Sequence, residues 1–171
     1  MDKSVVEAGI ATPFDGYRDV VRPEWIDGNG HMNVGYYLVV FDFATDEFMG
    51  WVGLDTDHRR EARVTTFCLE AHVTYQREVR AGDPLRFTTQ LLAHDAKRLH
   101  YVHAMYHAGV GYLAATNELM SLHVSAETRR AAAMAPEVMA RLARIQVAHA
   151  ALPRPPYVGR RMGLEARPTT R

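Results

Sequence analysis

In the middle of this chain the spacing of apolar residues changes from the period of a helix to the period of a strand. Between residues 34 and 52 the apolar positions recur at helical spacing, and Gly53 is a natural end for the helix that this predicts. Apolar and polar residues then alternate, as in strands, over residues 67–76, 85–93, 99–107 and 112–124. The connections between these segments are short, which favours an antiparallel meander. A long helix followed by antiparallel strands predicts an α+β fold in which the sheet curves around the helix.

The remaining segments complete the expected organisation. Residues 18–26 are expected to form a short strand before the helix, which makes the sheet five-stranded. Residues 53–64 are polar and basic and are expected to form a loop, whereas residues 136–150 have the spacing of a C-terminal helix. We expect an irregular lead-in over residues 1–14 and an extended tail rich in proline and arginine over residues 151–171.

Length and composition favour some classes of protein and argue against others. With 171 residues the chain can bury one core well, so we expect a single domain over residues 1–171. The formal net charge is zero, which gives no support for a nucleic-acid partner. The longest apolar stretch, residues 34–40, is too short to span a membrane, and residues 1–7 lack a signal-peptide pattern. Cys68 is the only cysteine, which fits a reducing cytoplasm.

The edges of the expected sheet point to self-association. A five-stranded open sheet leaves unpaired backbone groups on its outer strands unless another chain covers them. An isologous contact between two copies would cover the same strand in both. We therefore expect a homodimer whose contact is made by strands.

A group of polar residues lies directly before the long helix. Asp27, Asn29, His31 and Asn33 alternate with glycine or apolar residues in a turn that leads into the helix. Turn formation and helix capping alone would explain the Asp, Asn and Gly residues, but they do not require His31. A carboxylate and an imidazole beside the free N–H groups of a helix N-terminus suit a site that stabilises a developing oxyanion. We favour this functional interpretation over the capping one.

The motif and the order of the elements resemble those of a known family. Asp27, Gly30, His31, Asn33 and, on the helix, Tyr37 match the pattern of hot-dog fold acyl-CoA thioesterases of the 4-hydroxybenzoyl-CoA thioesterase group. This general resemblance covers residues 16–125. Within the family, the stretches 82–84, 89–100 and 118–124 are similar to those of betainyl-CoA thioesterases of carnitine degradation.

The resemblance implies hydrolysis of a CoA thioester without a metal or redox cofactor. Asp27 would be the catalytic carboxylate, either as the base that activates water or as the nucleophile. Backbone N–H groups near Val34 and Gly35 would polarise the thioester carbonyl, while His31 and Asn33 would orient the thioester or the water. The active site of such enzymes lies at a subunit interface, so the resemblance implies a homodimer or a dimer of dimers.

The substrate is the least constrained part of this prediction. The best candidate is betainyl-CoA, which hydrolysis would convert to glycine betaine. Another short or aromatic acyl-CoA is the alternative within the same chemistry. A non-catalytic acyl-CoA-binding protein is an alternative from another class, because fold alone does not fix activity. A hot-dog dehydratase is a third, and it would use His31 rather than Asp27 as the base.

Glu118 is the one carboxylate in a mostly apolar row of the last strand. One hypothesis places Glu118 in the acyl pocket, where it would attract a trimethylammonium group together with the rings of Trp25, Tyr36 or Tyr37. The other makes Glu118 a surface residue or a member of a structural ion pair, since a buried, unpaired carboxylate is costly. The sequence leaves both open.

Basic residues are candidates for binding the phosphates of CoA, and histidines are candidates for binding a metal. Arg77, Lys97 and Arg98 are the basic residues that we assign to CoA, although charged hairpin tips are also common on surfaces. On the expected strand over residues 99–107, His103 and His107 share a face, whereas His100 points the other way. No metal site is therefore expected.

Overall fold

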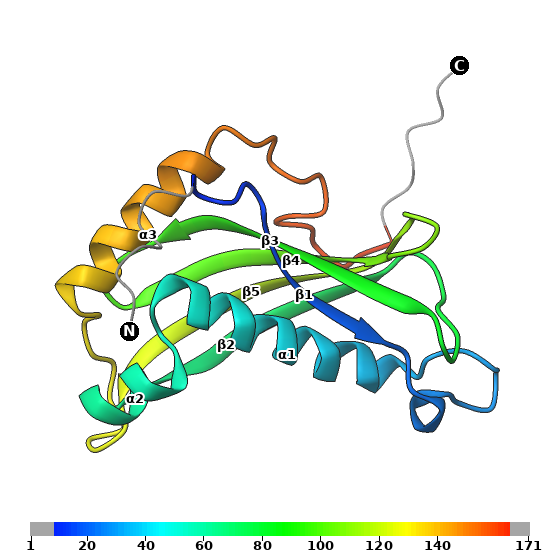
Figure 1. Cartoon of the computed structure of the whole chain (residues 1–171), viewed down its shortest axis with the longest axis horizontal. Coiled ribbons are helices and arrows are strands. Elements are labelled where there is room, and N and C mark those ends of the chain that lie inside the picture. The colour runs from blue at the N-terminus through cyan, green and yellow to red at the C-terminus, as the bar shows by residue number, and fades with distance from the viewer. Residues whose placement is uncertain (1–8, 165–171) are drawn as a thin grey trace.

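The computed structural model describes residues 9–164 and shows one antiparallel sheet with a long helix along one face (Figure 1). The strands are β1 (Phe14–Val20), β2 (Val64–Tyr75), β3 (Pro84–His94), β4 (Arg98–His107) and β5 (Leu113–Ser125). The helices are α1 (Val34–Val52), α2 (Thr56–Ala62), α3 (Pro136–His149) and a short 3-10 turn, η2 (Pro23–Trp25). The predicted α+β hot-dog architecture, with a five-stranded sheet, a central helix and a C-terminal helix, is confirmed.

The strands are ordered β1-β3-β4-β5-β2 across the sheet. Strands β3, β4 and β5 form a meander, but β2 pairs with β5, as in the register pair His72↔Glu118. The expected meander of four consecutive strands is therefore wrong for one pairing, because β2 lies beside β5 and not beside β3. The reason is that β1 occupies the other edge of β3, with Tyr17 opposite Phe87, so β2 can pair only at the β5 edge.

Aromatic side chains fix α1 against the sheet. The ring of Phe41 meets that of Phe87 on β3 edge-on at 5.7 Å, and the ring of Phe48 lies 5.1 Å from that of Tyr101 on β4. These four side chains are almost completely buried. Full burial of a large apolar side chain stabilises by about 1.5–3 kcal/mol, so contacts of this kind hold α1 in place. The position of the α1 N-terminus relative to the sheet follows from them.

One histidine lies inside the core between α1 and the sheet. Both ring nitrogens of His103 are hydrogen-bonded, one to the Thr89 hydroxyl at 2.8 Å and the other to the Thr45 hydroxyl at 2.9 Å. Burial lowers the pKa of His103 to about 3. The neutral ring is thus held as a structural polar group by two threonines.

A second histidine joins three segments at the other end of α1. His149, at the end of α3, accepts a hydrogen bond from the Leu91 N–H of β3 at Nδ1 (2.8 Å) and donates from Nε2 to the Ala11 carbonyl (2.8 Å). Its ring also stacks on Trp51 of α1, with centroids 6.0 Å apart. Burial lowers the pKa of His149. This histidine ties α3 and the N-terminal segment to the sheet.

Two local predictions are wrong. The first strand covers Phe14–Val20 rather than residues 18–26, because the chain turns into η2 at Pro23. Residues 56–62 form α2 instead of a loop, with the Asp55 side chain accepting a hydrogen bond from the His58 N–H at its start. Because α2 is short and has no buried residue, apolar spacing did not indicate it.

The two ends of the chain are described only in part. Residues 9–13 and 151–164 contain no strand or helix, whereas Phe14 of the expected lead-in already belongs to β1 and residues 156–159 of the expected tail form a turn. The rest of both predictions falls on residues 1–8 and 165–171, which lie outside the described part. Within residues 9–164, no helix combines the length and the hydropathy needed to cross a membrane. The expectation of a single domain over residues 1–171 stays a prediction.

Candidate active site

The polar turn predicted from the sequence is a small closed loop before α1. Ile26 and Met32 form an antiparallel bridge that closes it. Inside, the Asp27 N–H donates to the His31 carbonyl, and the Gly30 N–H donates to the Asp27 carbonyl, both at 3.0 Å. Gly30 has a φ of +82°, a left-handed conformation that favours glycine. The Met32 N–H donates to the carbonyl of Val79 at 2.9 Å and so attaches the turn to the β2–β3 connection.

Asn33 is the N-cap of α1. Its side-chain oxygen accepts a hydrogen bond from the Gly35 N–H at 2.9 Å, and its carbonyl accepts one from the Tyr36 N–H at 3.0 Å. The Val34 N–H has no hydrogen-bond partner among residues 9–164. Of the two backbone donors predicted for the oxyanion, Val34 is available and Gly35 is engaged by Asn33.

Asp27 and His31 face each other across the turn. Asp27 Oδ1 lies 3.8 Å from His31 Nδ1 and accepts a hydrogen bond from the Asn29 N–H at 2.8 Å. Asp27 Oδ2 accepts no hydrogen bond from any residue that the structure describes. The Asp27 side chain is 23% exposed and that of His31 34%. A carboxylate oxygen with free bonding capacity and partial access to solvent can accept a hydrogen bond from a water or attack a substrate carbonyl carbon.

A pocket of about 340 Å³, the Asp27 pocket, opens in front of these groups. It is built by the turn, by the first residues of α1 and by the segment where β2 leads into β3. The residues that line it are Asp27, His31, Met32, Val34, Tyr37, Tyr75, Gln76, Arg77 and Glu78. The fold therefore brings together the start of a helix and a connection more than forty residues away in sequence.

Two tyrosines form the apolar wall of the Asp27 pocket. The rings of Tyr37 and Tyr75 meet edge-on with centroids 5.2 Å apart, and the Tyr75 hydroxyl donates to the Val34 carbonyl at 3.4 Å. Burial raises the pKa of both hydroxyls. These phenols stay neutral at physiological pH and offer ring edges and faces to a ligand.

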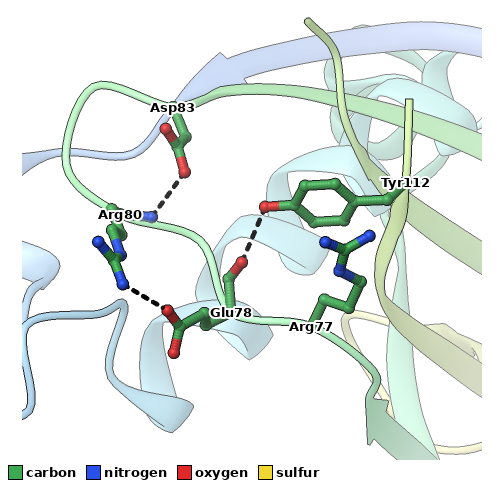
Figure 2. A pocket seen from close by; sticks show the side chains of 5 residues that line it. All are labelled: Arg77, Glu78, Arg80, Asp83 and Tyr112. Atoms are coloured by element: carbon green, nitrogen blue, oxygen red, sulfur yellow. Dashed lines mark hydrogen bonds and ion pairs between the residues drawn. The ribbon is translucent and has the colours of Figure 1, made fainter. Parts of the chain in front are cut away.

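A second pocket, the Arg80 pocket of about 320 Å³, adjoins the first and shares Arg77 and Glu78 with it (Figure 2). The Arg77 guanidinium lies over the ring of Tyr112 at 4.0 Å, and the Tyr112 hydroxyl donates to the Glu78 carbonyl at 2.9 Å. The Glu78 carboxylate pairs with the Arg80 guanidinium at 2.8 Å. Two arginines, Arg77 and Arg80, and two carboxylates, Glu78 and Asp83, line this pocket, so its charges balance.

Trp25 and Tyr36 lie next to the site but do not line the Asp27 pocket. Trp25 is buried, its ring stacks on that of Tyr36 with centroids 5.8 Å apart, and its carbonyl accepts a hydrogen bond from the Asn33 N–H. Both rings support the start of α1.

Glu118 lies in a different pocket, the Glu118 pocket, of about 340 Å³. Its neighbour Leu119 packs in the core, and successive residues of a strand point to opposite faces, so Glu118 is on the face away from α1. Glu118 pairs with His100 Nε2 at 2.8 Å and accepts a hydrogen bond from the Gly159 N–H at 2.7 Å. The structure shows Glu118 hydrogen-bonded to His100 and does not bring it to the Asp27 pocket.

Lys97 and Arg98 also lie away from the Asp27 pocket. They belong to the β3–β4 hairpin, which is beside α3, at the opposite end of the sheet from the α1 N-terminus (Figure 1). Arg98 pairs with Asp95 of the same hairpin at 2.6 Å. Of the three basic residues predicted for CoA, only Arg77 lines the Asp27 pocket.

Sequence reasoning missed the contribution of the β2–β3 connection, namely Tyr75, Gln76 and Glu78. No local pattern marks these residues, because their approach to the turn depends on the strand order. Among residues 9–164, no group of three or more histidine, cysteine or acidic side chains is placed to hold a metal ion.

Comparison with known proteins agrees with the fold. The family model of the thioesterase-like superfamily matches residues 21–142, and the chain belongs to that superfamily. It is a thioesterase, a hydrolase of thioesters, as the sequence predicted.

Relatives of known activity and known structure cover nearly all of the chain. A betainyl-CoA thioesterase of Pseudomonas aeruginosa is 45% identical over 148 residues, which are 86% of this chain and 93% of the relative. An L-carnitine dehydrogenase/betainyl-CoA thioesterase of Ruegeria pomeroyi is 41% identical over 89% of this chain, which spans 31% of that longer protein. A Staphylococcus aureus protein solved in complex with CoA has a TM-score of 0.84 and 29% identity, over 93% of this chain and 99% of that one.

Proposed function

We propose that this protein hydrolyses an acyl-CoA thioester, and that its substrate is betainyl-CoA, which water cleaves to glycine betaine and free CoA. The observation that carries the proposal is that Asp27 and Val34 line one pocket, while Asp27 Oδ2 and the Val34 N–H have no hydrogen-bond partner among residues 9–164. The activity of the Pseudomonas aeruginosa relative supports the acyl group. The substrate and the single cysteine support a reducing, cytoplasmic location.

Asp27 performs the central step in this proposal. As a base, Asp27 removes a proton from a water that attacks the thioester carbonyl, and the thiolate of CoA leaves with a proton. As a nucleophile, Asp27 forms a mixed anhydride that water then opens. In both cases the Val34 N–H and the positive end of the α1 dipole stabilise the oxyanion. His31 orients the attacking group, and Asn33 holds the start of α1 in place.

The CoA moiety is proposed to lie along the side of the site where Arg77 and Arg80 offer guanidinium groups. Arg77 borders both the Asp27 pocket and the Arg80 pocket, so its guanidinium can meet a phosphate without leaving the site. Lys97 and Arg98 would meet the same CoA only if a second protomer supplied them.

A second protomer is proposed to close the site. Strand β2 is an edge strand, and it exposes Phe67, Leu69 and Tyr75, while the neighbouring α1 exposes Leu38 and Phe43. An apolar, unpaired edge of this kind suits an isologous strand contact, which would extend the sheet across a homodimer or a dimer of dimers. Sedimentation equilibrium tests this: a monomer at micromolar concentration would contradict it.

Thiol release from a panel of CoA esters tests the activity. Betainyl-CoA, acetyl-CoA, butyryl-CoA and 4-hydroxybenzoyl-CoA are offered at equal concentrations, and free CoA is measured with a thiol reagent. We expect release from betainyl-CoA with the highest kcat/KM. Release from another ester with a higher kcat/KM would overturn the choice of acyl group, and binding without release from any ester would overturn the proposal of hydrolysis.

A further inference from the structure

Glu78 is the only acidic residue besides Asp27 among those that line the Asp27 pocket. It lies where β2 leads into β3, and its backbone is held by the Tyr112 hydroxyl, which donates to its carbonyl at 2.9 Å. The next residue, Val79, accepts a hydrogen bond from the Met32 N–H and so links the segment to the catalytic turn. We propose that the Glu78 carboxylate, with the rings of Tyr37 and Tyr75, selects a positively charged acyl group. This inference rests on the proposed function and assigns the specificity of its site.

The charges around the pocket leave Glu78 available for such a group. Arg77, the one cation lining the Asp27 pocket besides the titratable His31, stacks on Tyr112. Arg80 pairs with Glu78, but the side chains of this pair are 71% and 53% exposed. Exposed ion pairs of this kind contribute little, so a quaternary ammonium entering the pocket can compete with Arg80 for the carboxylate.

The aromatic wall supplies the second requirement of a trimethylammonium group. Such a group cannot donate a hydrogen bond, and proteins bind it through aromatic faces and nearby negative charge. Tyr37 and Tyr75 provide two rings at an angle to each other, 5.2 Å apart. Burial raises the pKa of Tyr37, and the negative charge of Glu78 adds to the rise, in accord with their closeness.

Glu118, the other carboxylate considered for this role, is less well placed in the protomer. Both of its oxygens are engaged, one by His100 and the other by the Gly159 N–H, and its pocket is not the one that holds Asp27. The Glu118 carboxylate, with both oxygens hydrogen-bonded, has less capacity left for a cation than the Glu78 carboxylate, which has one exposed pair with Arg80.

Two esters of nearly identical shape isolate the effect of the charge. Betainyl-CoA and 3,3-dimethylbutanoyl-CoA differ only by a nitrogen cation in place of a carbon. The cation also activates the thioester carbonyl, but equally in every variant, so the change in the ratio of their kcat/KM values between two variants measures charge recognition. We expect Glu78→Gln to lower this ratio roughly 5- to 20-fold, the range of one carboxylate–cation contact near a surface, and Glu78→Asp to retain part of it. An unchanged ratio in Glu78→Gln would overturn the inference.

A change of opposite sign is expected at Arg80. Arg80→Gln removes the cation that neutralises Glu78, so it should raise the ratio, even if contacts with CoA change both kcat/KM values together. Glu127→Gln is the matched control, because Glu127 is an exposed carboxylate in the turn after β5. A fall in the ratio with Glu118→Gln and none with Glu78→Gln would assign the role to Glu118 and overturn the inference.

Binding separates this inference from the proposed hydrolysis. In an Asp27→Asn background both esters are kept intact, and their Kd values are measured by calorimetry with Glu78 or Gln at position 78. Tighter binding of betainyl-CoA that depends on Glu78 and weakens with added salt would support the inference even if the wild type released no thiol. Equal Kd values for the two esters with Glu78 present would overturn it, whatever the wild type hydrolyses.

Discussion

The two ends of α1 use polar groups in opposite ways. At the N-terminal end, Asp27 and His31 are partly exposed, 3.8 Å apart, and Asp27 has an oxygen with no partner among the described residues. At the C-terminal end, His149 is fully buried, both ring nitrogens are hydrogen-bonded, and its ring stacks on Trp51. Both ends contain an imidazole, but only the first has spare bonding capacity and access to a ligand.

This difference separates function from structure better than residue type does. A buried, fully bonded histidine stabilises the fold and offers nothing to a substrate. A partly exposed carboxylate such as Asp27, with one oxygen unpartnered among the described residues, stabilises little and is available for chemistry. Mutation of Asp27 at the N-terminal end should therefore lower activity and leave stability nearly unchanged, whereas mutation of His149 at the C-terminal end should lower stability and leave activity nearly unchanged.

The largest effect is expected for Asp27→Asn, which keeps the shape of the side chain and its acceptor for the Asn29 N–H. We expect kcat to fall roughly 10²- to 10⁴-fold, because the amide can neither accept the proton nor attack the thioester. The melting temperature should stay close to that of the wild type, as measured by calorimetry. Asp57→Asn, a surface carboxylate paired with Arg60 on α2, is the control and should change neither quantity.

His149→Leu should show the reverse pattern. The substitution leaves the Leu91 N–H and the Ala11 carbonyl without their partner, which costs about 2–4 kcal/mol of unfolding free energy. Urea denaturation measures the loss, and kcat at a temperature where the variant is folded should remain near that of the wild type. A stable but inactive variant would contradict the division between the two ends.

The pH dependence of stability sharpens the same comparison. Burial lowers the pKa values of His149 and His103, the latter to about 3, so below the ordinary histidine pKa the unfolded chain binds more protons than the folded one. Their contribution to stability is complete above pH 6.5 and falls as the pH decreases, by up to about 1.4 kcal/mol per pH unit for each histidine. Urea midpoints at pH 7.5, 6.0 and 5.0 measure this slope. The change of the urea midpoint with pH should be smaller in His149→Leu than in the wild type. Equal slopes in the variant and the wild type would count against a stabilising role for neutral His149.

The smallest effect is expected for Asn33→Ala. Loss of the N-cap bond to the Gly35 N–H should cost about 1 kcal/mol of unfolding free energy. The kcat should fall modestly, since the position of the Val34 N–H depends on the start of α1. Asn33→Asp, which retains an acceptor for Gly35, is the matched comparison and should restore most of the stability; equal destabilisation by both changes would argue against a capping role.

The fold was predictable where the pattern is local. The bounds of α1 agree with residues 34–52, because its apolar stripe is long and Gly53 adopts the left-handed conformation that ends a helix. The helix α2 was not predictable from apolar spacing, because no residue in it is buried. The place of β2 beside β5 could not be read from short connections, since it depends on which edge β1 occupies.

The site, too, was predictable only where its residues are close together in the sequence. Asp27, His31 and Val34 are close in sequence, and the structure brings them to one pocket. Glu78 and Tyr75 reach that pocket only through the strand order, so nothing in their local sequence marked them. Glu118 and Lys97 were assigned from strand alternation and charge, which do not tell which end or face of the sheet a residue occupies.

A crystal structure of Asp27→Asn with intact betainyl-CoA tests the central claim most directly. The account predicts the thioester carbonyl carbon roughly 3–3.5 Å from the side chain at position 27, within attack distance. It also predicts the carbonyl oxygen on the Val34 N–H and the trimethylammonium group between Tyr37, Tyr75 and Glu78. A thioester bound away from position 27, for example in the Glu118 pocket, would contradict the account.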